Sequence, residues 1–142
     1  MKVETVIGKG EEKVVIYLNE RSSLIESIEK VVESYKKELT GYKDSEIYKL
    51  SYLDAEAYSV EDGRVYAYIG EMKLSIKERL YIIEEIVGDV FVKINQSCIV
   101  NISRIKKFET SIGGSVRVVT EGGFKDYISR RQLRTVKERL GF

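Results

Sequence analysis

The chain has 142 residues, of which 43% are hydrophobic and 33% charged, and its formal net charge at pH 7 is +1. This composition is typical of one soluble globular domain, and no stretch approaches the roughly 20 apolar residues of a membrane span. The sequence has no histidine and a single cysteine, Cys98, which excludes histidine-dependent triads, disulfides within the chain and cysteine-based zinc clusters. We therefore expect neither an enzyme nor a bound metal or other cofactor. The N-terminus lacks the apolar core of a signal peptide, which favours a cytoplasmic location.

The charge is unevenly distributed along the chain. Residues 1–44 and 45–87 carry net charges of −1 and −4, whereas residues 88–142 carry eleven basic and five acidic side chains, a net charge of +6. Such asymmetry indicates a basic face with an anionic partner, although a solvated surface explains a charge of +6 equally well.

Residues 1–44 are predicted to form a small β-β-α extension. Short strands are expected over 2–7 and 13–18, followed by a helix within 22–39 that has a Ser23–Glu26 capping box near its start and a stop at Gly41. Apolar residues at three- and four-residue steps predict which helix face turns inward: Leu24, Ile28, Val31, Tyr35 and Leu39, widened by Ile25 and Val32. The extension is expected to pack on the rest of the chain or to form a homodimer.

Residues 45–142 indicate a mainly β, antiparallel domain with short helices, so the class is α+β overall. Strands are expected over 47–53, 55–60, 65–69, 90–94, 98–100, 104–111, 115–120 and 124–128. Asp62-Gly63 is a strong hairpin signal between two of them. A second capping box, Ser75 with Glu78, predicts a helix from there to about Val87, and Ser129 with Gln132 predicts the start of a C-terminal helix.

Three consecutive polar residues, Asn95, Gln96 and Ser97, interrupt the apolar run that begins at Phe91. In a buried strand each of these side chains would need a hydrogen-bond partner. We therefore expect the triplet to leave the core as a loop, anchored by the apolar residues on either side.

Candidate catalytic residues have ordinary structural explanations. The carboxylate pair Glu84-Glu85 falls on a helix surface, where solvated charge is the simplest reading. Gly8-Lys9-Gly10 lacks the strand-loop-helix context and the Lys-Ser/Thr ending of a phosphate-binding loop. Ser75 and Ser129 are explained as helix caps, and no histidine is present to activate them.

The basic residues of the last third are more informative. Arg130 and Arg131 are expected in the first turn of the C-terminal helix, where cations oppose the macrodipole and cost roughly a few tenths of a kcal/mol each. Such a helix start is instead well suited to bind phosphate or read a base edge. Lys77 behind Ser75 repeats the arrangement. Surface cations explain either case alone, but the repetition beside the polar triplet favours nucleic acid.

From about Ser45 to the C-terminus the chain resembles the LytTR family of bacterial DNA-binding domains. The clearest match is an aromatic, a basic residue, a polar triplet ending in serine and an apolar-Val-Asn-apolar run, which here are Phe91, Lys93, Asn95-Gln96-Ser97, Ile99-Val100-Asn101-Ile102 and the following Ile105. The family's closing strand and Ser-Arg corner match Tyr127-Ile128-Ser129-Arg130-Arg131, and its earlier hairpin matches Tyr58 through Tyr68.

The resemblance implies an elongated, mostly β fold that docks loops, rather than a recognition helix, into DNA major grooves. Amide and guanidinium groups suit base edges, whereas hydroxyls and lysines suit backbone oxygens. The residues implied to contact DNA are Arg64 at the hairpin tip, Lys93, Asn95, Gln96 and Ser97 in the polar loop, Ser129, Arg130 and Arg131 at the strand-to-helix corner, and Ser75 with Lys77 against phosphate.

The family is best known as the output half of response regulators, and residues 1–44 are too few for the receiver domain that precedes it there. The resemblance therefore implies a stand-alone transcriptional regulator, with a DNA-binding domain over residues 45–142 preceded by the extension. Its partner would be double-stranded DNA, and no small-molecule substrate is expected. It is also expected to be a homodimer, at least on DNA. Some such regulators are controlled by a neighbouring membrane protein, which would be a further partner.

One departure from the family pattern supports a second hypothesis. Family members commonly have His-Arg where this chain has Asn95-Gln96, which removes a cation, although glutamine can still pair with adenine. With the low net charge, this departure leaves open a protein-interaction or sensory module on the same scaffold, with weak or lost DNA binding.

Overall fold

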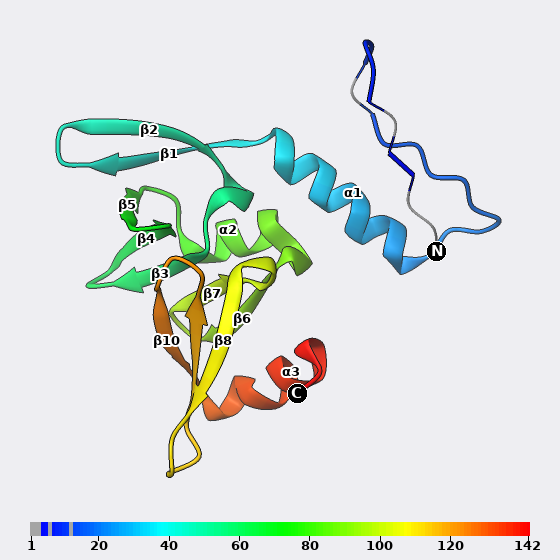
Figure 1. The fold of residues 1–142 in the computed structure, drawn as a ribbon. Helices are drawn as coiled ribbons and strands as arrows, with labels where there is room; N and C mark the ends of the chain where they lie inside the picture. The colour runs from blue at the N-terminus through cyan, green and yellow to red at the C-terminus, as the bar shows by residue number, and fades with distance from the viewer. Residues whose placement is uncertain (1–3, 6, 12) are drawn as a thin grey trace.

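The computed structural model describes residues 4–5, 7–11 and 13–142. In chain order the elements are α1 (Ser23–Lys36), β1 (Glu38–Lys43), β2 (Glu46–Ser51), η1 (Tyr52–Asp54), β3 (Ala57–Glu61), β4 (Arg64–Ile69), β5 (Met72–Ile76), α2 (Leu80–Val87), η2 (Gly88–Val90), β6 (Phe91–Asn95), β7 (Cys98–Asn101), η3 (Ile102–Arg104), β8 (Ile105–Thr110), β9 (Val116–Thr120), β10 (Lys125–Ile128) and α3 (Arg130–Leu140) (Figure 1). Within the described residues, no helix is long and apolar enough to cross a membrane.

The strands form two antiparallel sheets. The larger has seven strands in the order β2-β1-β5-β4-β3-β7-β6, and the smaller has three in the order β10-β9-β8. The predicted hairpin turn is present, with positive φ angles of 49° at Asp62 and 76° at Gly63, as a tight turn between twisted strands requires. The prediction of a mainly β, antiparallel chain with short helices is confirmed.

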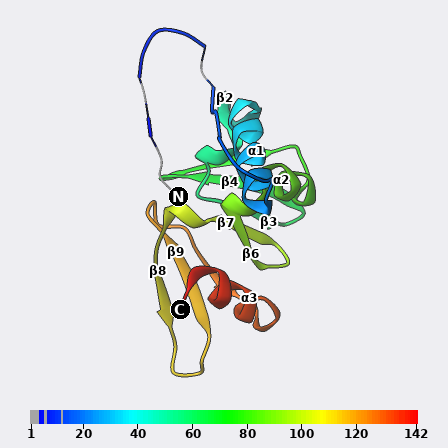
Figure 2. The same ribbon diagram turned by 90° about the vertical axis from the view of Figure 1, so that its right-hand side faces the viewer.

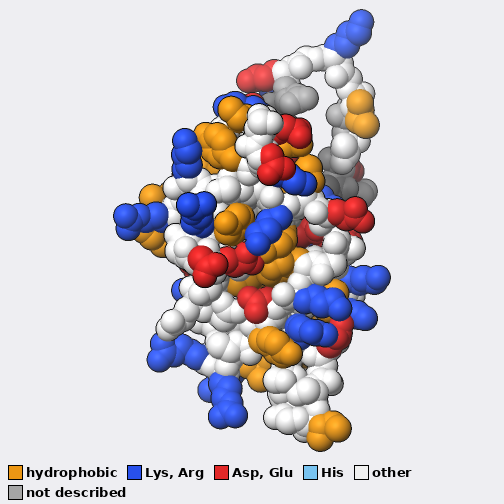
Figure 3. Space-filling view, turned by 90° about the vertical axis from the view of Figure 1, so that its left-hand side faces the viewer, with side chains coloured by type: hydrophobic (Ala, Val, Ile, Leu, Met, Phe, Trp, Pro, Cys, Tyr) orange, Lys and Arg blue, Asp and Glu red, His pale blue; other side chains and the backbone are white. Residues whose placement is uncertain are grey.

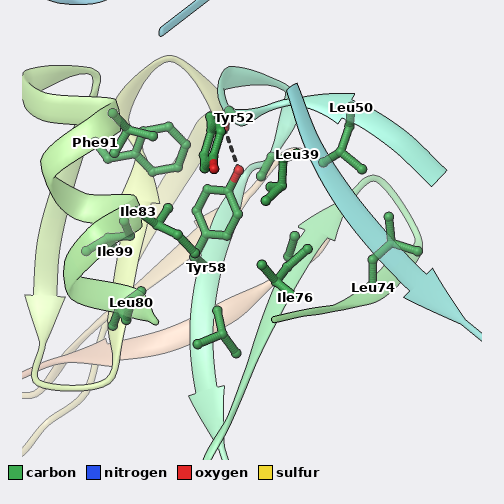
Figure 4. Packing of buried hydrophobic residues seen from close by; sticks show 14 residues of the cluster. Leu39, Leu50, Tyr52, Tyr58, Leu74, Ile76, Leu80, Ile83, Phe91 and Ile99 are labelled. Atoms are coloured by element: carbon green, nitrogen blue, oxygen red, sulfur yellow. Dashed lines mark hydrogen bonds between the residues drawn. The ribbon is translucent and has the colours of Figure 1, made fainter. Parts of the chain in front are cut away.

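Two apolar clusters occupy the two faces of the seven-stranded sheet. Tyr58, Phe91 and Ile99 point to the face covered by α2, where Ile83 is fully buried among them (Figure 4). The Tyr58 hydroxyl donates a 2.6 Å hydrogen bond to the carbonyl oxygen of Tyr52, so this core contains a paired polar atom. The opposite face packs against the smaller sheet and α3 through a second cluster: Ala57, Val92, Ile94, Cys98, Val100, Val116, Val118, Ile128 and Val136.

A buried carboxylate helps to join the two sheets. Glu56 is 5% exposed and accepts hydrogen bonds from the backbone N–H groups of Gly70, at 2.9 Å, and Gly122, at 2.6 Å. Gly70 lies between β4 and β5, and Gly122 between β9 and β10. A Cβ at Gly122 would overlap the Glu56 carboxylate, so this position requires glycine. Glu56 thus fixes the turn of one sheet against the turn of the other.

The predicted helix from Ser75 is wrong in its first part. Met72–Ile76 form strand β5, which pairs with β4, and α2 begins only at Leu80, after Arg79. Leu74 and Ile76 are buried on alternate positions of β5, so pairing with a long neighbouring strand outweighs a local capping pattern.

The predicted helix stop at Gly41 is also wrong. Helix α1 ends at Lys36, and Gly41 lies inside strand β1, which pairs with β2 and β5. A Cβ at Gly41 would lie 2.9 Å from the Cβ of Leu74, so the glycine allows close approach of two strands rather than a helix end. Strand β1 therefore attaches the end of the predicted extension to the large sheet.

The predicted strand over 13–18 is wrong for the single chain, where these residues have no regular secondary structure and no strand pairing. Of the strand predicted over 2–7, the described residues are not in a strand, and residues 2, 3 and 6 lie outside the described residues. Of the α1 residues predicted to face inward, Ile25 is buried and Ile28 and Val32 are half-buried, but they lie beside Val14, Ile16 and Leu18 rather than in either core cluster. Three residues predicted to face inward are exposed, namely Leu24, Val31 and Tyr35.

Candidate nucleic-acid interface

The tip of the β3–β4 hairpin carries Arg64 at the first position of β4. Its side chain is exposed and has no acidic partner among the described residues. Strand β5 runs antiparallel to β4 and pairs Ile76 with Val65, so Lys77 follows directly beside Arg64. The Lys77 ammonium lies 4.7 Å from the ring centroid of Tyr42, which orients this cation without neutralising it.

A neighbouring cation on strand β5, Lys73, is neutralised. Lys73 forms an ion pair with Glu61, and the Tyr68 hydroxyl also donates to that carboxylate. Burial raises the pKa of Tyr68 to about 12, and its hydrogen bond to Glu61 acts in the same direction. Burial also acts to raise the pKa of Glu61, but the bonds from Lys73 and Tyr68 outweigh it and lower that pKa. Because Lys73 is paired with Glu61, the cations available to bind an anion at this tip are Arg64 and Lys77.

The polar triplet lies at the turn between β6 and β7, with Asn95 ending β6 and Gln96-Ser97 forming the turn, and its three side chains have different surroundings. The Asn95 amide nitrogen donates to Asp126 at 3.0 Å and to the carbonyl oxygen of Tyr127 at 2.9 Å, and its oxygen accepts from the Ser97 N–H at 2.9 Å. Asn95 therefore holds the turn in place. Gln96 and Ser97 are exposed, and their side chains make no hydrogen bond within the part of the chain that the structure describes.

The strand-to-helix corner after β10 presents two arginines. Ser129 is the N-cap of α3, and its hydroxyl accepts from the Gln132 N–H at 3.3 Å, which confirms the predicted helix start. Arg130 and Arg131 then occupy the first turn, both exposed and neither with an acidic partner among the described residues. By contrast, Arg134 one turn later is paired with Glu138 at 3.2 Å.

Backbone hydrogen bonds bring these three segments together. The Val60 N–H donates to the carbonyl oxygen of Ser97 at 2.8 Å, which joins the β3–β4 hairpin to the β6–β7 turn. The Ser129 N–H donates to the carbonyl oxygen of Ile94 at 2.8 Å, which joins that turn to the start of α3. The β3–β4 hairpin points to the left in Figure 1, and Figure 3 views the molecule from that side, where lysine and arginine side chains lie around much of the outline with acidic groups between them. We call the surface formed by Arg64, Lys77, Gln96, Ser97, Arg130 and Arg131 the turn surface.

Two predicted contact residues lie away from the loops. Ser75 is half-buried in the middle of the strand pairing, opposite Tyr66, so it does not cap a helix. Lys93 is half-buried in β6 and lines a hollow of about 250 Å³ together with Gln132 and Arg139 of α3. Lys93 therefore lies beside α3 rather than in the β6–β7 turn.

Sequence reasoning missed the residues that position the turn surface. Asp126 holds Asn95, and Tyr42 holds Lys77. Nothing local in the sequence identifies Asp126, because its partner lies 31 residues away. Asn101, which belongs to the motif of the resemblance, is 2% exposed and donates to the carbonyl oxygens of Leu53 and Ala55 at 3.1 and 3.2 Å. Its role is to join β7 to the segment before β3.

The described residues give little support for a metal site or a reactive thiol. No group of three or more acidic or cysteine side chains suitable for a metal ion occurs in the described residues. Cys98 is buried, and burial raises the pKa of its thiol well above the ordinary value, so it is an unreactive core residue.

Comparison with known proteins gives a consistent result. The sequence model of the LytTr DNA-binding domain family matches residues 45–141 of this chain. A Staphylococcus aureus (strain NCTC 8325) protein, named an uncharacterized HTH-type transcriptional regulator, is 31% identical over 144 residues, covering 99% of this chain and 98% of its own length. A second so named, from strain MSSA476, is 32% identical over 118 residues, covering 83% of this chain and 79% of its own.

A solved structure supports the same conclusion for the fold. It is a LytTr DNA-binding domain from Bacillus cereus, with a TM-score of 0.67 and 18% sequence identity, covering 75% of this chain and 99% of that one. The family is a DNA-binding one rather than a family of enzymes, in agreement with the expectation from the sequence. The chain belongs to the LytTr DNA-binding domain family.

Proposed function

We propose that this chain is a transcriptional regulator that binds double-stranded DNA sequence-specifically through the turn surface. The observation that carries the proposal is that backbone hydrogen bonds, Val60 to Ser97 and Ser129 to Ile94, join three turns from distant parts of the sequence at one end of the fold. All four basic side chains of this surface lack an acidic partner among the described residues, namely Arg64, Lys77, Arg130 and Arg131. Unneutralised cations beside free polar groups suit a phosphate backbone and the base edges within its grooves.

Each side chain has a role that follows from its chemistry. The Gln96 amide can donate to and accept from an adenine edge, and the Arg130 and Arg131 guanidinium groups suit guanine. The Ser97 hydroxyl and the Lys77 ammonium suit phosphate oxygens. Asn95 is a positioning residue, because its donor and acceptor atoms are already used within the chain. Ser129 acts through α3, whose first turn it caps.

The proposed reading element is a set of turns rather than a recognition helix. In the described part of the chain, α1 is followed by β1, α2 leads through η2 into β6, and α3 is the last element. No two helices there are joined by a short turn in the helix-turn-helix manner. The turns project from strands, so a major groove would be entered by Gln96 and the α3 start.

The proposal includes a homodimer, because one module of this size buries limited surface on DNA. A regulator of this kind would act in the cytoplasm without a small-molecule substrate or cofactor. A membrane-protein inhibitor would be a further partner and would be expected to compete with DNA. A protein-interaction module with lost DNA binding is the competing function, motivated by the missing cation at Asn95-Gln96.

Selection of bound sequences from a random double-stranded DNA pool, followed by fluorescence anisotropy on the selected site and a scrambled site, tests the proposal. We expect an enriched motif and a preference of at least about 1,000-fold for the selected site at physiological salt. Equal affinity for the two sites, or no detectable binding, would overturn it. Capture of a protein partner by a chain that ignores DNA would support the competing function.

A further inference from the structure

Residues 13–18, Lys-Val-Val-Ile-Tyr-Leu, have the composition of a strand but no strand partner. They have no regular secondary structure and are followed by a bend at Asn19-Glu20. Their backbone groups make no hydrogen bond with any other described residue. Tyr17 is 91% exposed and Val14 is 61% exposed. A β-branched and aromatic segment with both edges unpaired is a template for pairing with another chain.

Helix α1 contacts η2 through the side that carries Ser27 and Lys30. Ser27 donates to Asp89 at 3.3 Å, and the Lys30 stem lies beside Gly88. At 100° per residue, Ile25 and Val32 lie on roughly the opposite side of the helix from Ser27. The apolar side of α1 therefore points away from the core formed by the two sheets.

An open groove runs between this apolar side and the segment of residues 13–18. Its volume is about 770 Å³, and its apolar lining is Val14, Ile16 and Leu18 from the segment and Ile25, Ile28 and Val32 from α1. Figure 2 shows the chain before α1 running beside the helix. Alternate residues of the segment thus face the groove, while Val15 and Tyr17 face outward, as in a strand. In the single chain the α1 side of the groove is covered, with Ile25 buried and Ile28 and Val32 half-buried, whereas Val14, Ile16 and Leu18 of the segment remain exposed.

We propose that residues 13–18 pair antiparallel with the same residues of a second copy of this chain, around a two-fold axis at Ile16. This register places Val14 opposite Leu18 of the partner copy, so the groove-facing residues of both copies lie on one face of the ribbon. The two α1 helices then cover that face. The interface is self-complementary and closes as a dimer. The inference rests on the proposed DNA-binding function only in that this dimer would be the one that binds DNA through its two turn surfaces.

Charge favours the antiparallel arrangement over a parallel one. Parallel pairing would set Lys13 beside Lys13 of the other copy, and like charges directly opposite are destabilising. Antiparallel pairing instead carries each Lys13 to the bend at Asn19-Glu20 of the other copy, where Glu20 is an opposite charge. Large exposed apolar surface rimmed by such polar groups marks a protein interface.

Cross-linking of single-cysteine positions tests the register. In Ile16→Cys the two cysteines would lie opposite each other across the axis, and their Cα atoms would be separated by about 4.4–6.8 Å, the range found in disulfides. We expect rapid covalent dimer formation under mild oxidation. Ile112→Cys, in an exposed loop between β8 and β9, is the matched control, and the buried native Cys98 should react in neither. Cross-linking of Ile16→Cys no faster than Ile112→Cys would overturn the register.

The mass of the full chain in solution tests the dimer itself. Light scattering at tens of micromolar should give twice the 16.3 kDa of one chain for the wild type, and one chain for Val14→Asp/Ile16→Asp with unchanged circular dichroism. A monomeric wild type, or a double variant that remains dimeric, would overturn the proposal. Binding to a DNA fragment that holds one half of the selected site distinguishes the proposed dimer from the proposed function. The monomeric variant should bind this fragment with wild-type affinity. A wild type that is dimeric but does not bind DNA would contradict only the proposed function.

Discussion

Asn95 donates a hydrogen bond to the Asp126 carboxylate at 3.0 Å, although the two residues are 31 positions apart in the sequence. The bond ties the β6–β7 turn to β10, immediately before the arginines of α3. It joins two segments of the turn surface through side chains, beside the backbone bond from Ser129 to Ile94. The relative placement of Gln96 and Arg131 therefore depends on a residue that is itself unavailable to DNA.

Asn95→Ala and Gln96→Ala should have different effects, although they are neighbours. Asn95→Ala removes three hydrogen bonds and should lower the free energy of unfolding by about 1–3 kcal/mol, with weaker binding to all DNA sequences. Gln96→Ala should leave stability within about 0.5 kcal/mol and cost about 1–3 kcal/mol on the selected site alone. Urea unfolding and anisotropy on selected and scrambled DNA measure both effects. Equal stability loss in the two variants would contradict the assignment.

Lys77→Ala should weaken binding on every DNA sequence to a similar degree. The Lys77 cation is oriented by Tyr42 beside Arg64 and suits a phosphate rather than a base. We expect the slope of log K against log salt to become shallower by about one unit, with the ratio between selected and scrambled DNA unchanged. Titrations at several salt concentrations check this. Lys73→Ala is the matched control, because that cation is already paired with Glu61; an equal change of slope would argue against the distinction.

Glu56→Ala should destabilise the fold strongly. The carboxylate is buried, and its loss would leave the N–H groups of Gly70 and Gly122 without their acceptor. Hydrogen bonds to charged groups contribute about 1.5–3 kcal/mol each, so we expect a loss on the order of 3 kcal/mol in chemical denaturation. Glu121→Ala, whose exposed carboxylate lies 3.8 Å from Arg104, should change stability by less than about 0.5 kcal/mol. A similar small effect at Glu56 would contradict its role in joining the sheets.

The Glu61 cluster should make part of the stability pH-dependent. Although burial acts to raise it, the pKa of Glu61 is lowered by Lys73 and Tyr68, so the folded chain holds this carboxylate ionised more readily than the unfolded chain does. The resulting stabilisation is present above the ordinary pKa of 4.5 and is lost as pH falls through the lower folded pKa. Because the group is partly exposed, the difference from Glu61→Gln should be no more than about 1 kcal/mol at pH 7. Unfolding curves for the two proteins should converge in acid, and a constant difference would contradict this.

The sequence alone identified most of the strands and the corner at Ser129, because alternation, Asp-Gly and the serine cap act locally. Strand β5 was missed because Ser75 and Glu78 imitate a capping box, while its pairing with β4 depends on residues elsewhere in the sheet. Gly41 was misread for a similar reason: it is glycine because the Leu74 side chain lies against it across β1 and β5. Both errors arise where contact between strands decides the structure.

For the candidate site, sequence reasoning found the polar turn but did not show that Asn95 positions the turn while Gln96 and Ser97 are exposed. Asn95, Gln96 and Ser97 are indistinguishable as polar residues, yet only Asn95 has partners on β10. The strand predicted over 13–18 illustrates the converse. Its composition is that of a strand, and the single chain supplies no partner for it.

The most direct test of the central claim is anisotropy of the Gln96→Ala/Arg131→Ala double variant on the selected and scrambled DNA sites. Arg104→Ala is the control, because η3 lies near the Gly70 turn at the other end of the sheet and Arg104 is close to Glu121. Reading by the turn surface predicts a loss of about 1–3 kcal/mol per residue on the selected site, a much smaller loss on the scrambled site and little change for the control. Unchanged affinity of the double variant for the selected site would contradict the account.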